Sequence, residues 1–179
     1  MRHFERFCLE ITPGAALFYP LLFFLDSSGA LAVVLPGILF HEVGHFLAAA
    51  LCGIRIRSLR LEITGLCLET DRAHSKKTEL ICLAAGPAAG FLWSMLAGAV
   101  GGDWMEKSAA ASLVLNGFNL LPGLPLDGGR ILQLAVGTSG PVLVTTALCA
   151  AAFFYLAIRW RAWACLLPAT LFGRELFIA

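Results

Sequence analysis

Long runs of apolar residues alternate along the chain with short polar stretches. A membrane-spanning helix needs roughly 20 predominantly apolar residues, so the chain has room for about six of them. We expect these helices at about 13–25, 30–51, 77–100, from about 105 through a break near 122–125, 141–158 and 163–178. The pattern therefore predicts an all-α polytopic membrane protein with about six transmembrane helices.

One segment, 54–70, has a different period. Apolar and polar residues alternate there, as in Ile54-Arg55-Ile56-Arg57, and a period of two predicts strands. The phase slips near Ser58, which indicates a β-bulge, and Thr64-Gly65 suits a hairpin turn. We expect a small β-hairpin or sheet after the second helix, on the cytoplasmic side of the membrane.

Composition and charge agree with a protein embedded in the lipid bilayer. The chain is 59% hydrophobic and 14% charged, with a mean hydropathy of +0.81, far above the usual soluble balance. The net charge is only +1, and the basic residues lie in several short loops instead of gathering on one face. Nucleic acid is therefore not an expected partner. The basic residues near the N-terminus and between the second and third helices predict a multi-pass protein with a cytoplasmic N-terminus.

Polar residues interrupt the second apolar helix at His41-Glu42-Val43-Gly44-His45. An ionisable residue at membrane depth is a functional-site hypothesis by default, because burying it is costly. His41 and His45 are four residues apart, so on a helix they share a face and can bind one metal ion. Catalytic zinc takes three protein ligands and a water whose pKa it lowers to about 7, and a neighbouring carboxylate can accept the water's proton. Glu42 fits that role of general base.

A third ligand must come from elsewhere in the chain. Asp127 is the only acidic residue between Lys107 and Arg174, and it follows a backbone broken by prolines. An unpaired acid at this depth is disfavoured, so we expect Asp127 to be the third ligand of one Zn²⁺ per chain. Glu62 and Glu69 are the alternatives.

Two segments, 41–45 and 119–129 (Asn119-Leu-Leu-Pro-Gly-Leu-Pro-Leu-Asp127-Gly-Gly), resemble the two signature motifs of the site-2 protease family of intramembrane zinc metalloproteases. The resemblance covers about 30–134 and is greatest to the compact branch of sporulation proteases that process a membrane-tethered sigma factor. It implies a three-helix catalytic core at about 30–137, zinc held by His41, His45 and Asp127, and Glu42 as the base. It also implies that Asn119 lies near the metal and helps to hold the substrate or the oxyanion. A helix–helix hydrogen bond is the competing interpretation of Asn119.

The resemblance implies an endopeptidase of the bacterial cytoplasmic membrane that cleaves a transmembrane protein and releases a regulator into the cytoplasm. We expect a single domain over 1–179 without a PDZ or CBS domain, so that substrate choice depends on the helices, the strand segment or regulatory membrane partners. Two other functions stay open. One is a membrane zinc peptidase with a glutamate as third ligand, acting at the cytoplasmic face. The other is a non-catalytic membrane scaffold.

Overall fold

The computed structural model describes residues 8–62, 65–71, 75–162 and 165–178. These residues divide between Asn116 and Gly117 into two compact units, an N-terminal and a C-terminal one. In chain order the elements are β1 (Cys8–Ile11), α1 (Pro13–Leu25), α2 (Ala30–Leu51), β2 (Ile56–Glu62), β3 (Gly65–Thr70), α3 (Lys76–Val100), α4 (Asp103–Asn119), α5 (Asp127–Val136), α6 (Ser139–Arg159) and α7 (Leu166–Ile178). The boundary between the units falls in the last turn of α4.

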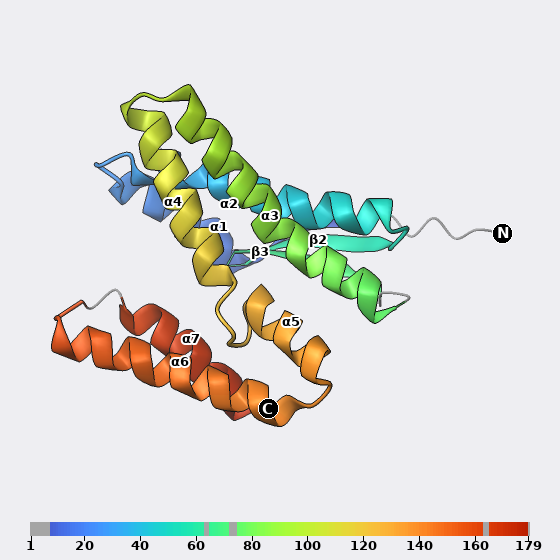
Figure 1. The fold of residues 1–179 in the computed structure, drawn as a ribbon. Helices are drawn as coiled ribbons and strands as arrows, with labels where there is room; N and C mark the ends of the chain where they lie inside the picture. The colour runs from blue at the N-terminus through green and yellow to red at the C-terminus, as the bar shows by residue number, and fades with distance from the viewer. Residues whose placement is uncertain (1–7, 63–64, 72–74, 163–164, 179) are drawn as a thin grey trace. The chain divides into compact units, whose positions relative to one another are not determined.

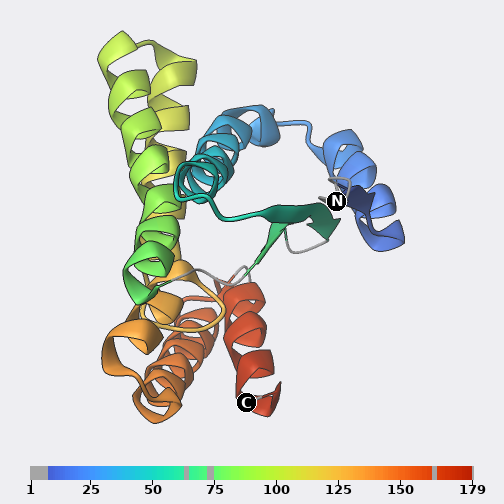
Figure 2. The same cartoon turned by 90° about the vertical axis from the view of Figure 1, so that its right-hand side faces the viewer.

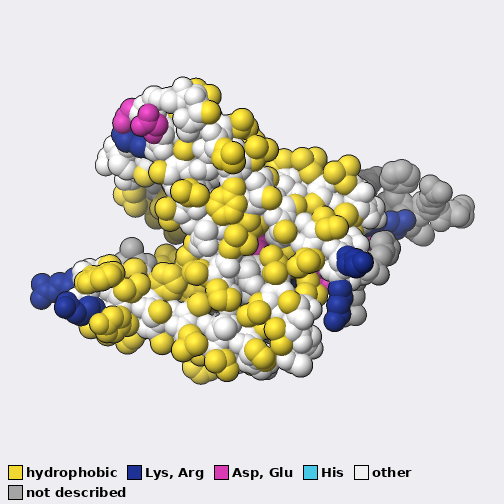
Figure 3. All heavy atoms as spheres, viewed as in Figure 1, with side chains coloured by type: hydrophobic (Ala, Val, Ile, Leu, Met, Phe, Trp, Pro, Cys, Tyr) yellow, Lys and Arg dark blue, Asp and Glu magenta, His cyan; other side chains and the backbone are white. Residues whose placement is uncertain are grey.

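The helices begin and end close to where the apolar pattern predicts them. Among the described residues, α2, α3 and α6 are long and apolar enough to cross a membrane. The break predicted near residues 122–125 is present and separates α4 from α5. Large apolar side chains are exposed along α1, α2, α3 and α6, and apolar atoms cover much of the face in Figure 3. This surface suits a lipid environment, while the count of six spans stays a prediction.

The expected hairpin or sheet is present: β2 and β3 belong to a three-stranded sheet in the order β1-β2-β3. β2 and β3 pair antiparallel, and their register shifts between Ile56 and Ser58, where the sequence pattern indicated a bulge. The predicted turn residue Thr64 lies outside the described residues. β1 was not predicted; it pairs with β2 in parallel, at a separation of about 50 residues along the chain.

In the N-terminal unit, α2 buries one face made mostly of small residues, with Gly44 against α3 and Gly37 against α4. Gly37, His41, Gly44 and Ala48 are buried on one face of α2. A Cβ atom on Gly44 would lie 2.3 Å from the backbone oxygen of Ala85, so only glycine allows this approach. Figures 1 and 2 show α3 and α4 side by side in the same unit. Backbones that approach so closely are typical of helix packing in membranes, where small residues line the contacts.

In the C-terminal unit, α6 and α7 lie side by side (Figure 1). The rings of Phe118, Phe153 and Phe172 pack together, with centroids 5.6 to 6.1 Å apart. Thr146 of α6 is fully buried and accepts a hydrogen bond from the backbone nitrogen of Leu124 at 3.0 Å. The segment between α4 and α5 is therefore tied to the helix pair of its own unit.

Candidate metal centre

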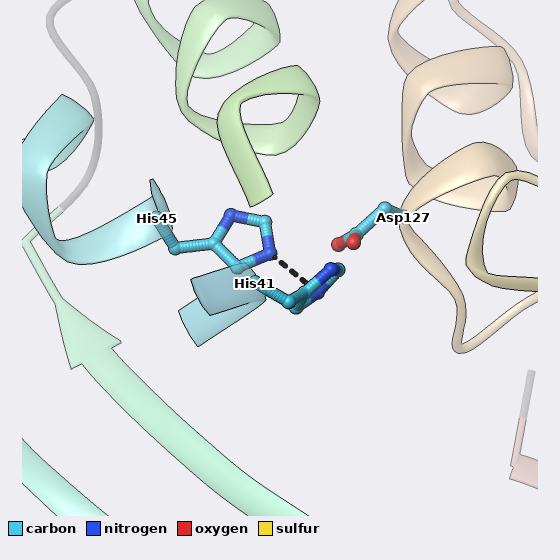
Figure 4. A group of neighbouring side chains, drawn as sticks. All are labelled: His41, His45 and Asp127. Atoms are coloured by element: carbon cyan, nitrogen blue, oxygen red, sulfur yellow. Dashed lines mark hydrogen bonds between the residues drawn. The ribbon is translucent and has the colours of Figure 1, made fainter. Parts of the chain in front are cut away.

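His41 and His45 lie one turn apart on α2 and point toward each other. Their Nε2 atoms are 3.0 Å apart, and the ring planes are nearly perpendicular, at 82°. Figure 4 shows both imidazoles and marks this short contact with a dashed line. His41 is buried and His45 is half-buried. The predicted pair is thus brought together in the structure.

The remaining ring nitrogen of His45 is fixed by α3. Its Nδ1 atom lies 2.8 Å from the backbone oxygen of Cys82. A carbonyl oxygen can only accept a hydrogen bond, so Nδ1 of His45 carries the proton. The lone pair of the neutral imidazole is then on Nε2, which faces His41.

The remaining ring nitrogen of His41 is fixed by α4. Its Nδ1 atom lies 2.7 Å from Oδ1 of Asn116. The Nδ2 group of Asn116 donates to the backbone oxygen of Ser112 at 2.7 Å, which leaves Oδ1 as the acceptor for His41. His41 therefore also carries its proton on Nδ1, with the lone pair on Nε2.

Two lone pairs that face each other at 3.0 Å are suited to bind one cation between them. Two nitrogens at 2.0–2.1 Å from a tetrahedral zinc ion are about 3.3 Å apart. Metal-ligating histidines usually donate their other N–H to a carbonyl or carboxylate, as both histidines do here. The side chains present therefore fit a zinc ion.

The other predicted residues lie on α2 and at the two ends of the broken segment. Glu42 is half-buried on α2 between the two histidines. Asn119 is the last residue of α4 and Asp127 the first of α5, and both belong to the C-terminal unit. Figure 4 draws the Asp127 carboxylate at the start of its helix.

Glycines fix the backbone on which Asp127 stands. A Cβ atom on Gly128 would lie 2.2 Å from the backbone oxygen of Leu120, and one on Gly129 would lie 2.4 Å from the carbonyl carbon of Gly123. No other residue type fits these positions without a backbone shift. The first turn of α5 is consequently packed directly on the loop that precedes it.

The alternative ligand Glu69 is engaged in the sheet. Its Oε2 accepts a hydrogen bond from Ser58 at 2.8 Å, and its Oε1 lies 3.2 Å from Nη1 of Arg60. The side chain of Glu62, the other alternative, lies outside the described residues. Glu69 therefore already has two partners within the sheet.

Sequence reasoning missed Asn116 and the carbonyl of Cys82. Asn116 carried a detectable signal, because it is a polar residue in an apolar helix and lies three residues before Asn119, on the same helix face. The carbonyl of Cys82 carried none, since every residue has one. Sequence reasoning also missed the part that Gly86 plays at the site. A Cβ atom at this position would lie 2.2 Å from Nε2 of His45.

Comparisons with known proteins agree with this geometry. No protein-family model matches the chain. "Putative zinc metalloprotease Rip3" of Mycobacterium tuberculosis is 30% identical over 138 residues, which cover 68% of this chain and 34% of that protein. "Zinc metalloprotease MJ0392" of Methanocaldococcus jannaschii is 28% identical over 144 residues, which cover 75% of this chain and 40% of that protein. The chain thus spans about a third to two fifths of the length of these curated relatives.

The fold has a solved counterpart. The structure titled "Site-2 Protease from Methanocaldococcus jannaschii" matches with a TM-score of 0.70 at 22% identity, over 94% of this chain and 90% of that one. The names of the relatives and this fold together support the site-2 protease family, whose motifs the segments 41–45 and 119–129 resemble. The relatives' names give zinc as the metal, in agreement with the paired imidazoles of this chain. The expectation of a zinc cofactor is therefore confirmed.

Proposed function

We propose that this chain is an intramembrane zinc metalloendopeptidase that hydrolyses a peptide bond in a transmembrane protein. The observation that carries the proposal is the pair of Nε2 atoms 3.0 Å apart on an apolar helix, each imidazole held by a partner on another helix. Ionisable side chains at membrane depth are costly to bury and point to function by default. Zinc, when bound, supplies a Lewis acid that polarises the substrate carbonyl and makes water nucleophilic near pH 7.

The proposed ligands are His41, His45 and Asp127. Each offers one ligand atom, an imidazole nitrogen or a carboxylate oxygen. Two histidines with one carboxylate are a known ligand set of catalytic zinc, and the fourth position stays open for water or substrate. The engagement of Glu69 with Ser58 and Arg60 supports Asp127 over a glutamate ligand from the sheet.

Glu42 and Asn119 are the proposed catalytic residues. Glu42 lies between the two ligands in sequence, so its carboxylate can accept the proton of the attacking water and pass it to the leaving amine. Asn119 would donate its amide N–H groups to the substrate or to the oxyanion that forms on the scissile carbonyl.

The proposed substrate is a transmembrane helix or its end, and the product a regulator released into the cytoplasm. Hydrolysis would occur about 10–20 Å below the cytoplasmic surface, if Arg55 marks that surface and the helix rises 1.5 Å per residue. We propose the bacterial cytoplasmic membrane as the location, with the N-terminus and the sheet on the cytoplasmic side.

Co-expression with membrane-anchored reporter proteins tests the proposal. Wild type should convert a susceptible reporter to a shorter product. Glu42→Gln should abolish conversion while keeping stoichiometric zinc, because only the proton acceptor is lost. Glu106→Gln, which changes an exposed glutamate of α4, is the matched control and should cleave normally. Identical processing by wild type and Glu42→Gln would show that hydrolysis at this site is not the function.

A further inference from the structure

The buried face of α4 is polar, which is unusual for a helix in an apolar protein. Ser108, Ser112 and Asn116 follow one another at intervals of four residues and are at most 1% exposed. Ser108 accepts a hydrogen bond from Nε1 of Trp93 at 3.1 Å, so it joins α4 to α3. Asn116 reaches a third helix, because its Oδ1 lies 2.7 Å from Nδ1 of His41 on α2.

Asn116 is itself held by a chain of hydrogen bonds in which Asn116 donates to Ser112 and Ser112 donates to Gly90. Its Nδ2 donates to the backbone oxygen of Ser112 at 2.7 Å and to the Ser112 hydroxyl at 3.2 Å. That hydroxyl in turn donates to the backbone oxygen of Gly90 at 2.8 Å. Every donor in this chain has an acceptor, so the amide can present only its oxygen to His41.

Packing fixes the same amide in place. A Cβ atom on Gly90 would lie 2.1 Å from Nδ2 and 2.2 Å from Oδ1 of Asn116. The amide therefore occupies the space that a side chain at position 90 would take. Gly90 of α3 thus fixes the position of the acceptor, and Ser112 of α4 fixes its orientation.

Stability alone does not account for this arrangement. Side-chain hydrogen bonds between membrane helices contribute little on average, because the unfolded chain in the membrane also finds partners. Loss of an outer partner of a metal-ligating histidine, by contrast, costs about 10- to 100-fold in metal affinity. We therefore expect the contact from Asn116 to His41 to contribute more to metal affinity than to the stability of the helix bundle.

We propose that Asn116 is a positioning residue of the metal centre, which holds the Nδ1–H tautomer of His41 and aims its Nε2 at the metal. This inference rests on the proposed function only in that His41 must be a zinc ligand. Nothing in it depends on the substrate or on Asp127.

Zinc affinity of the purified full chain in detergent micelles, measured by chelator competition, tests the role. Asn116→Leu should weaken zinc binding by about 10- to 100-fold. Asn116→Asp keeps an acceptor for His41 and should restore affinity to within about threefold of wild type, because carboxylates serve as such partners. Ser108→Ala, which removes a helix–helix hydrogen bond from the same buried face without touching His41, should bind zinc like wild type.

A structural role would give a different pattern. If Asn116→Leu lowers the melting temperature but binds zinc like wild type, the proposal is wrong. Nitrogen chemical shifts of His41 in the metal-free protein give a second readout: wild type should show the Nδ1–H tautomer and Asn116→Leu a mixture. Should Asn116→Leu not fold, Asn116→Ala replaces it, because it removes the same acceptor without adding bulk, and wild-type zinc affinity and tautomer there would equally overturn the proposal. Failure of the proposed function is distinct, because His41→Ala would then bind as much zinc as wild type.

Discussion

Gly86 of α3 leaves open the space that the imidazole of His45 fills. A Cβ atom at position 86 would lie 2.2 Å from Nε2 and 2.5 Å from Cε1 of His45. The run of small residues at 84–90 therefore does more than allow two helices to approach. One of its glycines makes room for the ring of a proposed metal ligand.

Gly86→Ala should consequently remove zinc from the protein without unfolding it. The added methyl group forces His45 away from His41, and we expect a loss of zinc affinity on the order of 100-fold or more, beyond the usual effect of an outer-shell change. Alanine is favoured over glycine in a helix by about 1 kcal/mol, so α3 itself is not weakened. Zinc content by mass spectrometry and the helical circular dichroism signal report the two effects separately.

Gly98→Ala is the matched control on the same helix. A Cβ atom at position 98 would meet only the side chain of Ala109, at 3.9 Å, which is ordinary contact. Zinc content should stay at the wild-type value. Equal zinc content in Gly86→Ala and Gly98→Ala would mean that His45 does not bind the metal through the face described.

Thr146 ties the loop before Asp127 to α6, and its hydroxyl should matter for stability. It accepts from the nitrogen of Leu124 at 3.0 Å and donates to the oxygen of Val142 at 2.7 Å. Thr146→Val leaves the N–H of Leu124 without this acceptor, which costs about 1–3 kcal/mol. Denaturant or thermal unfolding should show the loss, and zinc affinity should fall as the loop loosens.

The neighbouring Thr145 supplies the control for this prediction. Its hydroxyl donates to the same oxygen of Val142 at 2.9 Å, whereas the hydrogen bond from Leu124 goes to Thr146. Thr145→Val should therefore leave stability and zinc affinity near the wild-type values. If both valine variants behave alike, the hydrogen bond to Leu124 does not anchor the loop.

Much of the fold could be predicted from the sequence because its signals are local. Apolar runs with proline, glycine or aspartate at their ends gave the bounds of α1 and α2, and alternation gave the β2–β3 pair with its bulge. β1 could not be predicted, because its four residues are too few to show a regular alternation of apolar and polar side chains. Its pairing with β2 joins Cys8 to Ser58, a contact that no local pattern encodes.

In the metal centre, too, the local features could be predicted and the contacts between helices could not. His41 and His45 were predicted because four residues make one helical turn. Their partners, Asn116 and the carbonyl of Cys82, depend on which faces of α3 and α4 meet α2. A single sequence does not state which faces meet, so the outer contacts of the site required the structure.

The choice of third ligand can be decided by comparing carboxylates. Asp127→Ala should lower zinc affinity at least as strongly as loss of an outer partner, thus by more than about 100-fold, because a direct ligand is removed. Glu69→Gln should keep zinc, since its carboxylate is occupied by Ser58 and Arg60. Zinc content measured after dialysis against a weak chelator distinguishes them. Retained zinc in Asp127→Ala together with loss in Glu69→Gln or Glu62→Gln would support the glutamate-ligand peptidase instead.

Asp26 should make the start of α2 sensitive to acid. Gly29 precedes the helix and has no side chain that could cap it. The Asp26 carboxylate caps the helix in its place. It accepts from the nitrogens of Leu31 at 2.7 Å and Ala30 at 3.1 Å. These bonds, that from Leu31 foremost, and the bond from the Ser28 hydroxyl hold the pKa of Asp26 below its ordinary value of 3.8.

A lowered pKa means that the folded protein favours the ionised carboxylate, so the stabilisation is present above pH 3.8 and is lost as pH falls through the folded-state pKa. Asp26→Ala should therefore lower the melting temperature at pH 7, and the difference from wild type should shrink as the pH falls below about 4. Asp26→Asn keeps an oxygen acceptor without a charge and should retain part of the stability with no pH dependence of its own in this range. Melting curves of the three proteins from pH 7 down to pH 3 give the comparison. A constant difference between wild type and Asp26→Ala across that range would show that ionised Asp26 does not cap α2.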